Sequence, residues 1–193
     1  MDFNAMIGNV RRAMSLDRSF YQQVANDERY SQEALMVVIV ASVLTGLGSF
    51  LGQLIGSNFV GALIALVLGV VLAVVGYYIW AYVVQWVGAK FFNGQATAPQ
   101  LLRTLGYAYG PTALAIFSFI PCFGGLIALV GGIWSLVCGF FAVRETHRLS
   151  DGQTIMTVVI GWVVVMVITV LVTIVVGTVF GISAMGMNAV FGR

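Results

Sequence analysis

The chain has 193 residues, of which 60% are hydrophobic and only 8% are charged, and its formal net charge is +2. A soluble domain carries about 25% charged residues, so this composition excludes a water-facing globule. A net charge this small, without basic clusters interleaved with aromatic residues, argues against a nucleic-acid partner. The composition predicts one all-α domain whose main partner is the lipid bilayer.

Residues 1–30 are the most polar segment and precede the first apolar run. Drawn as a helix at about 100° per residue, residues 3–14 gather their apolar side chains within roughly 120°, and Arg11 and Arg12 face away from them. A basic amphipathic helix tethered to a membrane lies on the leaflet surface. We therefore predict an amphipathic helix on the cytoplasmic surface, with these two arginines at the lipid headgroups. The competing interpretation is that its apolar face binds another protein.

Five apolar stretches follow, each with about the length that a membrane-spanning helix needs. We predict spans at 34–55, 59–89, 98–120, 126–143 and 151–182, within a transmembrane domain at 31–185, and a short non-cytoplasmic tail at 186–193. Capping-box patterns begin the third span at Thr97 to Gln100 and the fifth at Ser150 to Gln153. Pro111 lies inside the third span and should kink it.

Basic residues indicate how the spans are oriented. Eight of the nine lysines and arginines precede the first span or flank the connections after spans two and four, and the other two connections carry no charge. The positive-inside rule then predicts a cytoplasmic N-terminus and an external C-terminus, in a cytoplasmic (inner) membrane. The alternative is that residues 111–143 form a re-entrant pair or one long helix, which would change the number of spans.

Ionisable residues are missing from the apolar core of every predicted span. Such residues mark proton relays and ion pathways, so a proton-coupled transporter is disfavoured. Cys122 and Cys138 lack metal-ligand spacing, and the only histidine, His147, lies near Glu145 in a connection expected to be solvated. With no nucleophile-elbow, zinc or paired-carboxylate motif in the membrane, we expect no enzyme, no metal and no cofactor.

Small residues recur at the spacing of packed helices. Gly61, Ala65, Gly69 and Ala73 occupy every fourth position of the second predicted span. Glycine pairs four residues apart occur in the first and fifth spans, at Gly48 and Gly52 and at Gly177 and Gly181. In lipid, close packing holds helices together, so these residues predict a packing ridge that is used within the chain, between copies or with other membrane proteins.

Several short motifs resemble the Yip family of five-helix membrane proteins, named for interaction with Ypt/Rab GTPases. The motif residues are Gly106, Tyr107, Pro111, Trp134, His147 and Ser150. The segment from Ser15 to Tyr21 is also similar, although Asp17 stands where the family has a proline. The resemblance covers roughly residues 15–182, points to the prokaryotic branch, and implies five spans and a cytoplasmic N-terminus. Because the cytoplasmic segment is short, GTPase binding is not transferred.

These observations lead to one leading hypothesis and two alternatives for function. The leading hypothesis is a non-enzymatic scaffold or accessory subunit that packs against other membrane proteins or against itself. The first alternative is permeation or lipid handling through a cleft beside the kinked third span. The second is a trafficking-type adaptor, as the resemblance implies for eukaryotic Yip proteins.

Overall fold

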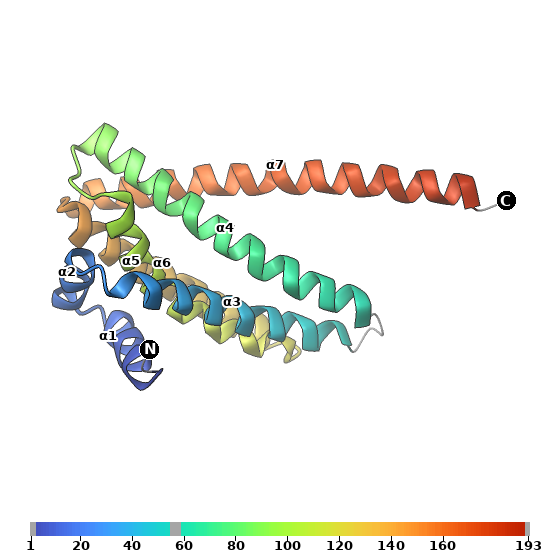
Figure 1. Cartoon of the computed structure of the whole chain (residues 1–193), viewed down its shortest axis with the longest axis horizontal. Coiled ribbons are helices and arrows are strands. Elements are labelled where there is room, and N and C mark those ends of the chain that lie inside the picture. Colours follow the sequence, from blue (N-terminus) through green and yellow to red (C-terminus); the bar gives the residue numbers. More distant parts are fainter. Residues whose placement is uncertain (1–2, 55–58, 192–193) are drawn as a thin grey trace.

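The computed structural model describes residues 3–54 and 59–191, and the side chains at 53–54, 169, 172–173 and 175–191 lie outside that description. All secondary structure within the described residues is helical, which confirms the all-α class (Figure 1). The elements are α1 (Phe3–Met14), α2 (Arg18–Asn26), α3 (Tyr30–Leu54), α4 (Phe59–Phe92), α5 (Ala98–Ala108), the 3-10 helix η1 (Gly110–Phe119), α6 (Gly124–His147) and α7 (Asp151–Phe191).

Four of the described helices are individually long and apolar enough to cross a membrane. These are Tyr30–Gly52 of α3, Phe59–Phe92 of α4, Gly124–His147 of α6 and Asp151–Ile168 of α7. They correspond to the first, second, fourth and fifth predicted spans. The α7 helix also continues through 186–191, which had been predicted as part of a tail.

The third predicted span differs from a single kinked helix. The chain forms α5, then breaks at Tyr109 and continues as the 3-10 helix η1. Pro111 explains the break, because it lacks an N–H and its ring clashes with the carbonyl four residues earlier in an α-helix. At about 1.5 and 2.0 Å per residue the two pieces rise about 16 and 20 Å. Together they have the length to cross the bilayer, although neither has it alone.

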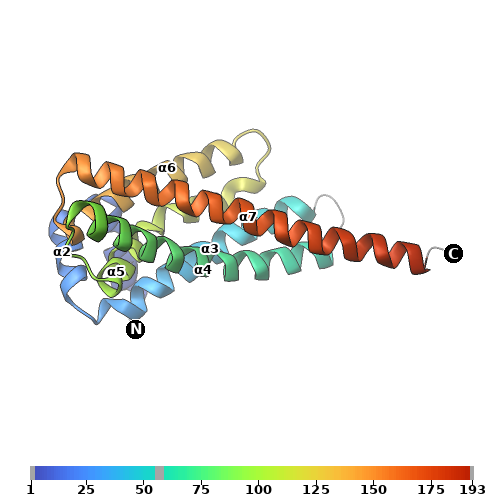
Figure 2. The same cartoon turned by 90° about the horizontal axis from the view of Figure 1, so that it is seen from above.

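The connections gather at two opposite ends of the bundle (Figures 1 and 2). One end holds α1, α2 and the connections 93–97 and 148–150, and we call it the basic end because the described basic residues lie there. The far end holds the connection 120–123 and the end of α3. Both views show α7 starting at the basic end and extending past the other helices.

The two N-terminal helices dock onto the basic end through the last carbonyls of α1. The hydroxyl of Tyr21 donates to the carbonyl of Ala13 over 3.1 Å, and the indole N–H of Trp134 donates to the carbonyl of Met14 over 3.0 Å. Carbonyls at a helix C-terminus have no partner within the helix. These bonds satisfy two of them and tie α1 to α2 and α6.

Arg103 forms similar hydrogen bonds to the last carbonyls of α2. Its guanidinium donates to the carbonyls of Val24, over 3.1 Å, and Ala25, over 2.6 Å, and the side chain is 6% exposed. By sequence alone, Arg103 is one of the positive charges that flank the connection between spans two and three. The structure instead buries it beneath the last turn of α2, where its charge also complements the negative end of the helix dipole.

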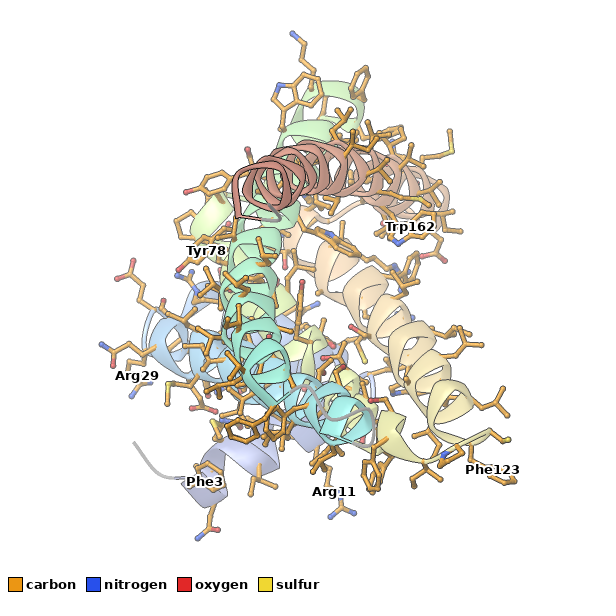
Figure 3. All side chains as sticks on the ribbon, turned by 90° about the vertical axis from the view of Figure 1, so that its right-hand side faces the viewer. Phe3, Arg11, Arg29, Tyr78, Phe123 and Trp162 are labelled. Atoms are coloured by element: carbon orange, nitrogen blue, oxygen red, sulfur yellow. The ribbon has the colours of Figure 1, made fainter. Side chains whose placement is uncertain are left out.

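The apolar face of α1 divides between the interior and the surface. Met6 and Ala13 are buried, whereas Phe3 and Ile7 are 63% and 54% exposed. Figure 3 shows Phe3 and Arg11 pointing away from the bundle. Part of the predicted face therefore packs on the chain itself, and its N-terminal part remains free for lipid or another molecule.

Candidate functional site

The predicted glycine pair in α3 lies against η1. A Cβ atom on Gly48 would lie 2.6 Å from the carbonyl oxygen of Ile116 and 2.7 Å from the hydroxyl of Ser118. Gly52 is less confined, because its added Cβ would meet only the Cα of Phe119, at 3.8 Å. This pair is therefore used within the chain. Gly177 and Gly181 lie in the part of α7 whose side chains are outside the described residues, so their surroundings are not described.

The small-residue ridge of α4 borders open space. Ala65 and Gly69 are exposed, and no atom lies within 4 Å of a Cβ built on Gly69. A groove of about 260 Å³ runs between this ridge and α3, and we call it the α3–α4 groove. Its lining includes Ser42, Thr45, Ser49, Ala65, Gly69 and Ala73. The chain's own side chains thus leave much of the ridge uncovered.

The walls of the α3–α4 groove combine small residues with hydroxyl groups. Thr45 donates to the carbonyl of Thr112 over 3.1 Å and so links α3 to η1. The hydroxyl of Ser49 donates to the carbonyl of Thr45 over 3.4 Å, one turn earlier in α3. Small and hydroxyl-bearing residues allow close approach and hydrogen bonding between helices in lipid. The groove therefore has the chemistry of a helix-docking surface.

Gly106 and Tyr107 lie at the junction of α3, α5 and α2. A Cβ on Gly106 would lie 2.8 Å from the carbonyl oxygen of Ala34, so only glycine permits this approach. The buried ring of Tyr107 makes edge contacts with Phe20 and Tyr30, at centroid distances of 5.2 and 6.2 Å. Two of the predicted motif residues therefore form the packing centre of the basic end.

Pro111 of η1 and Trp134 of α6 lie at the packing contacts on the other side of the break at Tyr109. A Cβ on Gly131 of α6 would lie 2.6 Å from the carbonyl oxygen of Pro111, which brings α6 tightly against η1. Trp134 bonds to the end of α1, as described above. Ser135, the next residue, donates to the carbonyl of Ala108 over 2.7 Å. The motif residues of the third and fourth predicted spans thus position α6 around the break.

His147 was expected in a solvated connection, and this expectation is wrong. It is the last residue of α6 and is 1% exposed. Its ring fills the space left by Gly88 and Gly94, and its Nδ1 accepts from the N–H of Ala96 over 3.3 Å. The ring therefore holds the connection 93–97 in place. No local pattern in the sequence predicts this burial, because the glycines that admit the ring lie more than fifty residues earlier.

Ser150 caps the start of α7, as the capping-box pattern predicts. Its N–H and hydroxyl both donate to the side-chain oxygen of Gln153, over 3.1 and 3.0 Å. Thr97 and Gln100 repeat this arrangement at the start of α5, over 2.9 and 3.1 Å. The two caps fix the directions in which the chain re-enters the bundle. The motif residues are therefore dispersed over the basic end and the break in the third predicted span, and do not converge on one reactive centre.

An apolar cavity of about 410 Å³ lies beside the break in the third predicted span. Its lining comes from α4, α5, η1, α6 and α7, and includes Tyr77, Trp80, Tyr109, Thr112, Gly132 and Trp162. The indole N–H of Trp80 is buried without a hydrogen-bond partner. The sequence predicts a cleft near this kink, but the aromatic residues of α4 and α7 that line the cavity are distant in the chain and are not apparent from the sequence.

The described residues contain no group of three or more histidine, cysteine, aspartate or glutamate side chains that could hold a metal ion. Cys122 is exposed and Cys138 is buried, and both are free thiols. Four long apolar helices around a hydrogen-bonded polar end define a multi-span membrane protein.

Comparison with known proteins identifies the family. Residues 14–174 match the family model of the Yip1 domain. Because the match covers most of the chain, the chain belongs to the Yip1 domain family, which confirms the resemblance found in the sequence. No match was found among the curated proteins or the solved structures.

Proposed function

We propose that this chain is a non-enzymatic membrane scaffold whose α3–α4 groove receives a helix of another membrane protein or of a second copy. The observation that carries the proposal is the open ridge, where Gly69 has no neighbouring atom within 4 Å of an added Cβ. Helix association in lipid depends on close packing and interhelical hydrogen bonds. A groove with small residues on one wall and hydroxyls on the other provides both.

The proposal includes an orientation for the molecule. Arginine and lysine residues gather at the basic end, and cytoplasmic loops carry an excess of these residues. The basic end then faces the cytoplasm, and α5 with η1 completes a fifth crossing. Phe3 and Ile7, the exposed apolar residues of α1, then lie at the height of the leaflet surface, where such a helix binds lipid.

Filling the groove tests the scaffold proposal. Gly69→Leu adds a large side chain at a position where an added Cβ meets no atom within 4 Å, so the fold should persist while association is lost. The measurement is chemical cross-linking in native membranes, followed by mass spectrometry of the products. Gly132→Leu is the matched control, because Gly132 is also open but lies on α6, outside the groove. Equal cross-linking of the wild type and Gly69→Leu would rule the proposal out.

Lipid handling is a second candidate, and the apolar cavity of about 410 Å³ favours it. This cavity lies within the membrane region and has the aromatic, apolar lining that suits an acyl chain. Gly132→Leu should fill it and slow the movement of a fluorescent lipid between the leaflets of liposomes that contain the protein. Gly69→Leu should leave that rate unchanged. Liposomes with the wild-type protein that move the probe no faster than empty ones would exclude this candidate.

A further inference from the structure

A second cavity, larger and polar, lies at the basic end. It has a volume of about 640 Å³ and lies between α2, the start of α5, the end of α6 and the connections beside them. We call it the polar cavity. The lining residues that matter here are Arg18, Gln22, Gln95, Arg144, Glu145 and Arg148. Its volume falls within the range of about 300–1,000 Å³ that is typical of ligand pockets.

The charge of the polar cavity is positive. Three arginines and one glutamate line it, and the glutamate is already engaged. Glu145 accepts from the side-chain amide of Gln22 over 2.7 Å and lies 3.8 Å from both Arg18 and Arg144. Asp151, outside the lining, pairs with Arg144 over 2.6 Å. Even with both acids counted, one positive charge remains.

Arg148 supplies that remaining charge. Among the described residues it forms no ion pair, whereas Arg18 and Arg144 each have at least one carboxylate partner. Its side chain is exposed at the wall of the cavity. The guanidinium group presents a planar fork of N–H donors that matches the oxygens of phosphate and carboxylate groups.

The backbone at Arg148 is also unusual. Its φ of 57° and ψ of 40° lie in the left-handed region, directly after the last residue of α6. Glycine or asparagine is preferred at this position, because a Cβ is disfavoured there. Strained residues of this kind gather at binding sites, where another requirement outweighs their cost. The arginine therefore lowers the stability of a turn that glycine would form more readily.

We propose that the polar cavity binds a phosphate group, carried by an anionic lipid headgroup or by a soluble phosphate compound. Arg148 and Arg144 supply the charged donors, and the amide of Gln95 adds a neutral one. Arg144 directly follows the apolar stretch of α6 and Arg148 comes one turn later, so the cavity lies at the height where a bilayer's headgroups begin. Basic pockets between transmembrane helices bind anionic headgroups at this level.

The test compares binding by the full chain and three single variants, purified in a neutral detergent. The probes are phosphatidylglycerol, phosphatidylcholine and inorganic phosphate, and native mass spectrometry counts the bound molecules. Arg148→Gly should weaken binding about tenfold or more, since hydrogen bonds to a charged group are lost. Arg29→Ala is the matched control, because Arg29 is 89% exposed, pairs with Asp27 and does not line the cavity.

Arg148→Gly separates the binding role from a structural role. Glycine relieves the left-handed backbone, so this variant should melt at a higher temperature than the wild type while it binds phosphate more weakly. A purely structural role predicts that both properties improve or stay unchanged. Arg148→Asn, which also tolerates this backbone conformation, provides a second variant with the same expected loss.

The three probes distinguish the two sources of phosphate. Phosphatidylglycerol that binds and resists displacement by inorganic phosphate indicates a lipid headgroup. Inorganic phosphate that binds alone and displaces the lipid indicates a soluble compound. The proposal is overturned if neither phosphatidylglycerol nor inorganic phosphate binds, or if phosphatidylcholine binds as well as phosphatidylglycerol. It is also overturned if Arg29→Ala weakens binding as much as Arg148→Gly. None of these outcomes depends on the α3–α4 groove.

Discussion

Apolar side chains in the core of the basic end are buried almost completely, whereas most of those along the first half of α4 are exposed. Phe20 and Leu101 are each 0% exposed, but Val60, Val67 and Leu72 are 66%, 55% and 57% exposed. The basic end is also crosslinked by side-chain hydrogen bonds to helix ends, from Tyr21, Trp134 and Arg103.

This difference shows which solvent each region meets. The basic end packs aromatic and aliphatic residues inside a polar shell, as a soluble domain does. The first half of α4 turns apolar residues outward, which is favourable only where lipid or another protein surrounds them. The fold's own stability should therefore be concentrated at the basic end, and the far half should supply surfaces for other molecules.

A charge placed on the outer face of α4 tests the lipid side of this comparison. Leu72→Arg should reduce membrane insertion at a cost of about 3 kcal/mol, because an arginine near the centre of a spanning helix is that unfavourable. The inserted fraction can be measured by the resistance of the chain to alkaline extraction from membranes. Leu72→Met is the neutral control. Normal insertion of Leu72→Arg would show that this face does not lie against lipid.

Two glycine substitutions compare the regions directly. Gly106→Leu should destabilise the chain by about 2–3 kcal/mol, because its Cβ alone would lie 2.8 Å from the backbone of Ala34. Gly69→Leu should change stability by less than about 0.5 kcal/mol, because its Cβ meets no atom within 4 Å. The measurement is unfolding by increasing mole fractions of sodium dodecyl sulfate. Similar losses at both positions would remove the distinction between a packed end and an open half.

Removing the buried arginine tests whether hydrogen bonds to helix ends hold the basic end together. Arg103→Ala should cost about 2 kcal/mol, because the buried carbonyls of Val24 and Ala25 lose their donor. Hydrogen exchange should then increase in α2 before it increases in α4. Lys90→Ala removes an exposed positive charge at the same end and should have little effect. Equal effects of the two changes would assign the loss to net charge and not to these bonds.

Features that depend on a local pattern of residues could be predicted from the sequence. Four apolar stretches became long helices because each has the composition and length of a spanning segment. The caps at Thr97 and Ser150 formed because their glutamine partners lie three residues away. Such features depend on neighbours in the chain, so they can be predicted without knowledge of the fold.

Features set by distant contacts could not be predicted in the same way. Arg103 bonds to carbonyls almost eighty residues earlier, and its sequence neighbours do not reveal this. Pro111 predicted a disturbed helix, but the sequence did not decide between a kink and a break. In the structure, the close approach of Gly131 to the carbonyl of Pro111 accompanies the 3-10 form of η1. The polar cavity was missed for the same reason, since α2, α5 and α6 all contribute to it.

Asp17 links α1 to α2, and its substitution should have the smallest effect on stability. Its carboxylate accepts from the backbone N–H of Phe20 over 3.1 Å, so it caps α2 at the position where the family resemblance suggested a proline. Asp17→Ala should cost about 1 kcal/mol, as is typical when an N-cap is lost. Asp17→Asn retains a capping oxygen and should cost less. Thermal unfolding at neutral pH measures both.

The pH dependence of this cap separates its charge from its hydrogen bonds. Bonds from Ser19 and Arg12 lower the pKa of Asp17 from 3.8 to about 2. Because the folded pKa lies below the unfolded one, the stabilisation from the charge is present above about pH 4 and is lost as the pH falls toward 2. Asp17→Asn should lack this fall. Asp27, whose pKa is lowered by Arg29, contributes a similar fall in both proteins. The difference between the two pH profiles therefore isolates Asp17, and identical profiles would show that its charge adds nothing to the docking of α2.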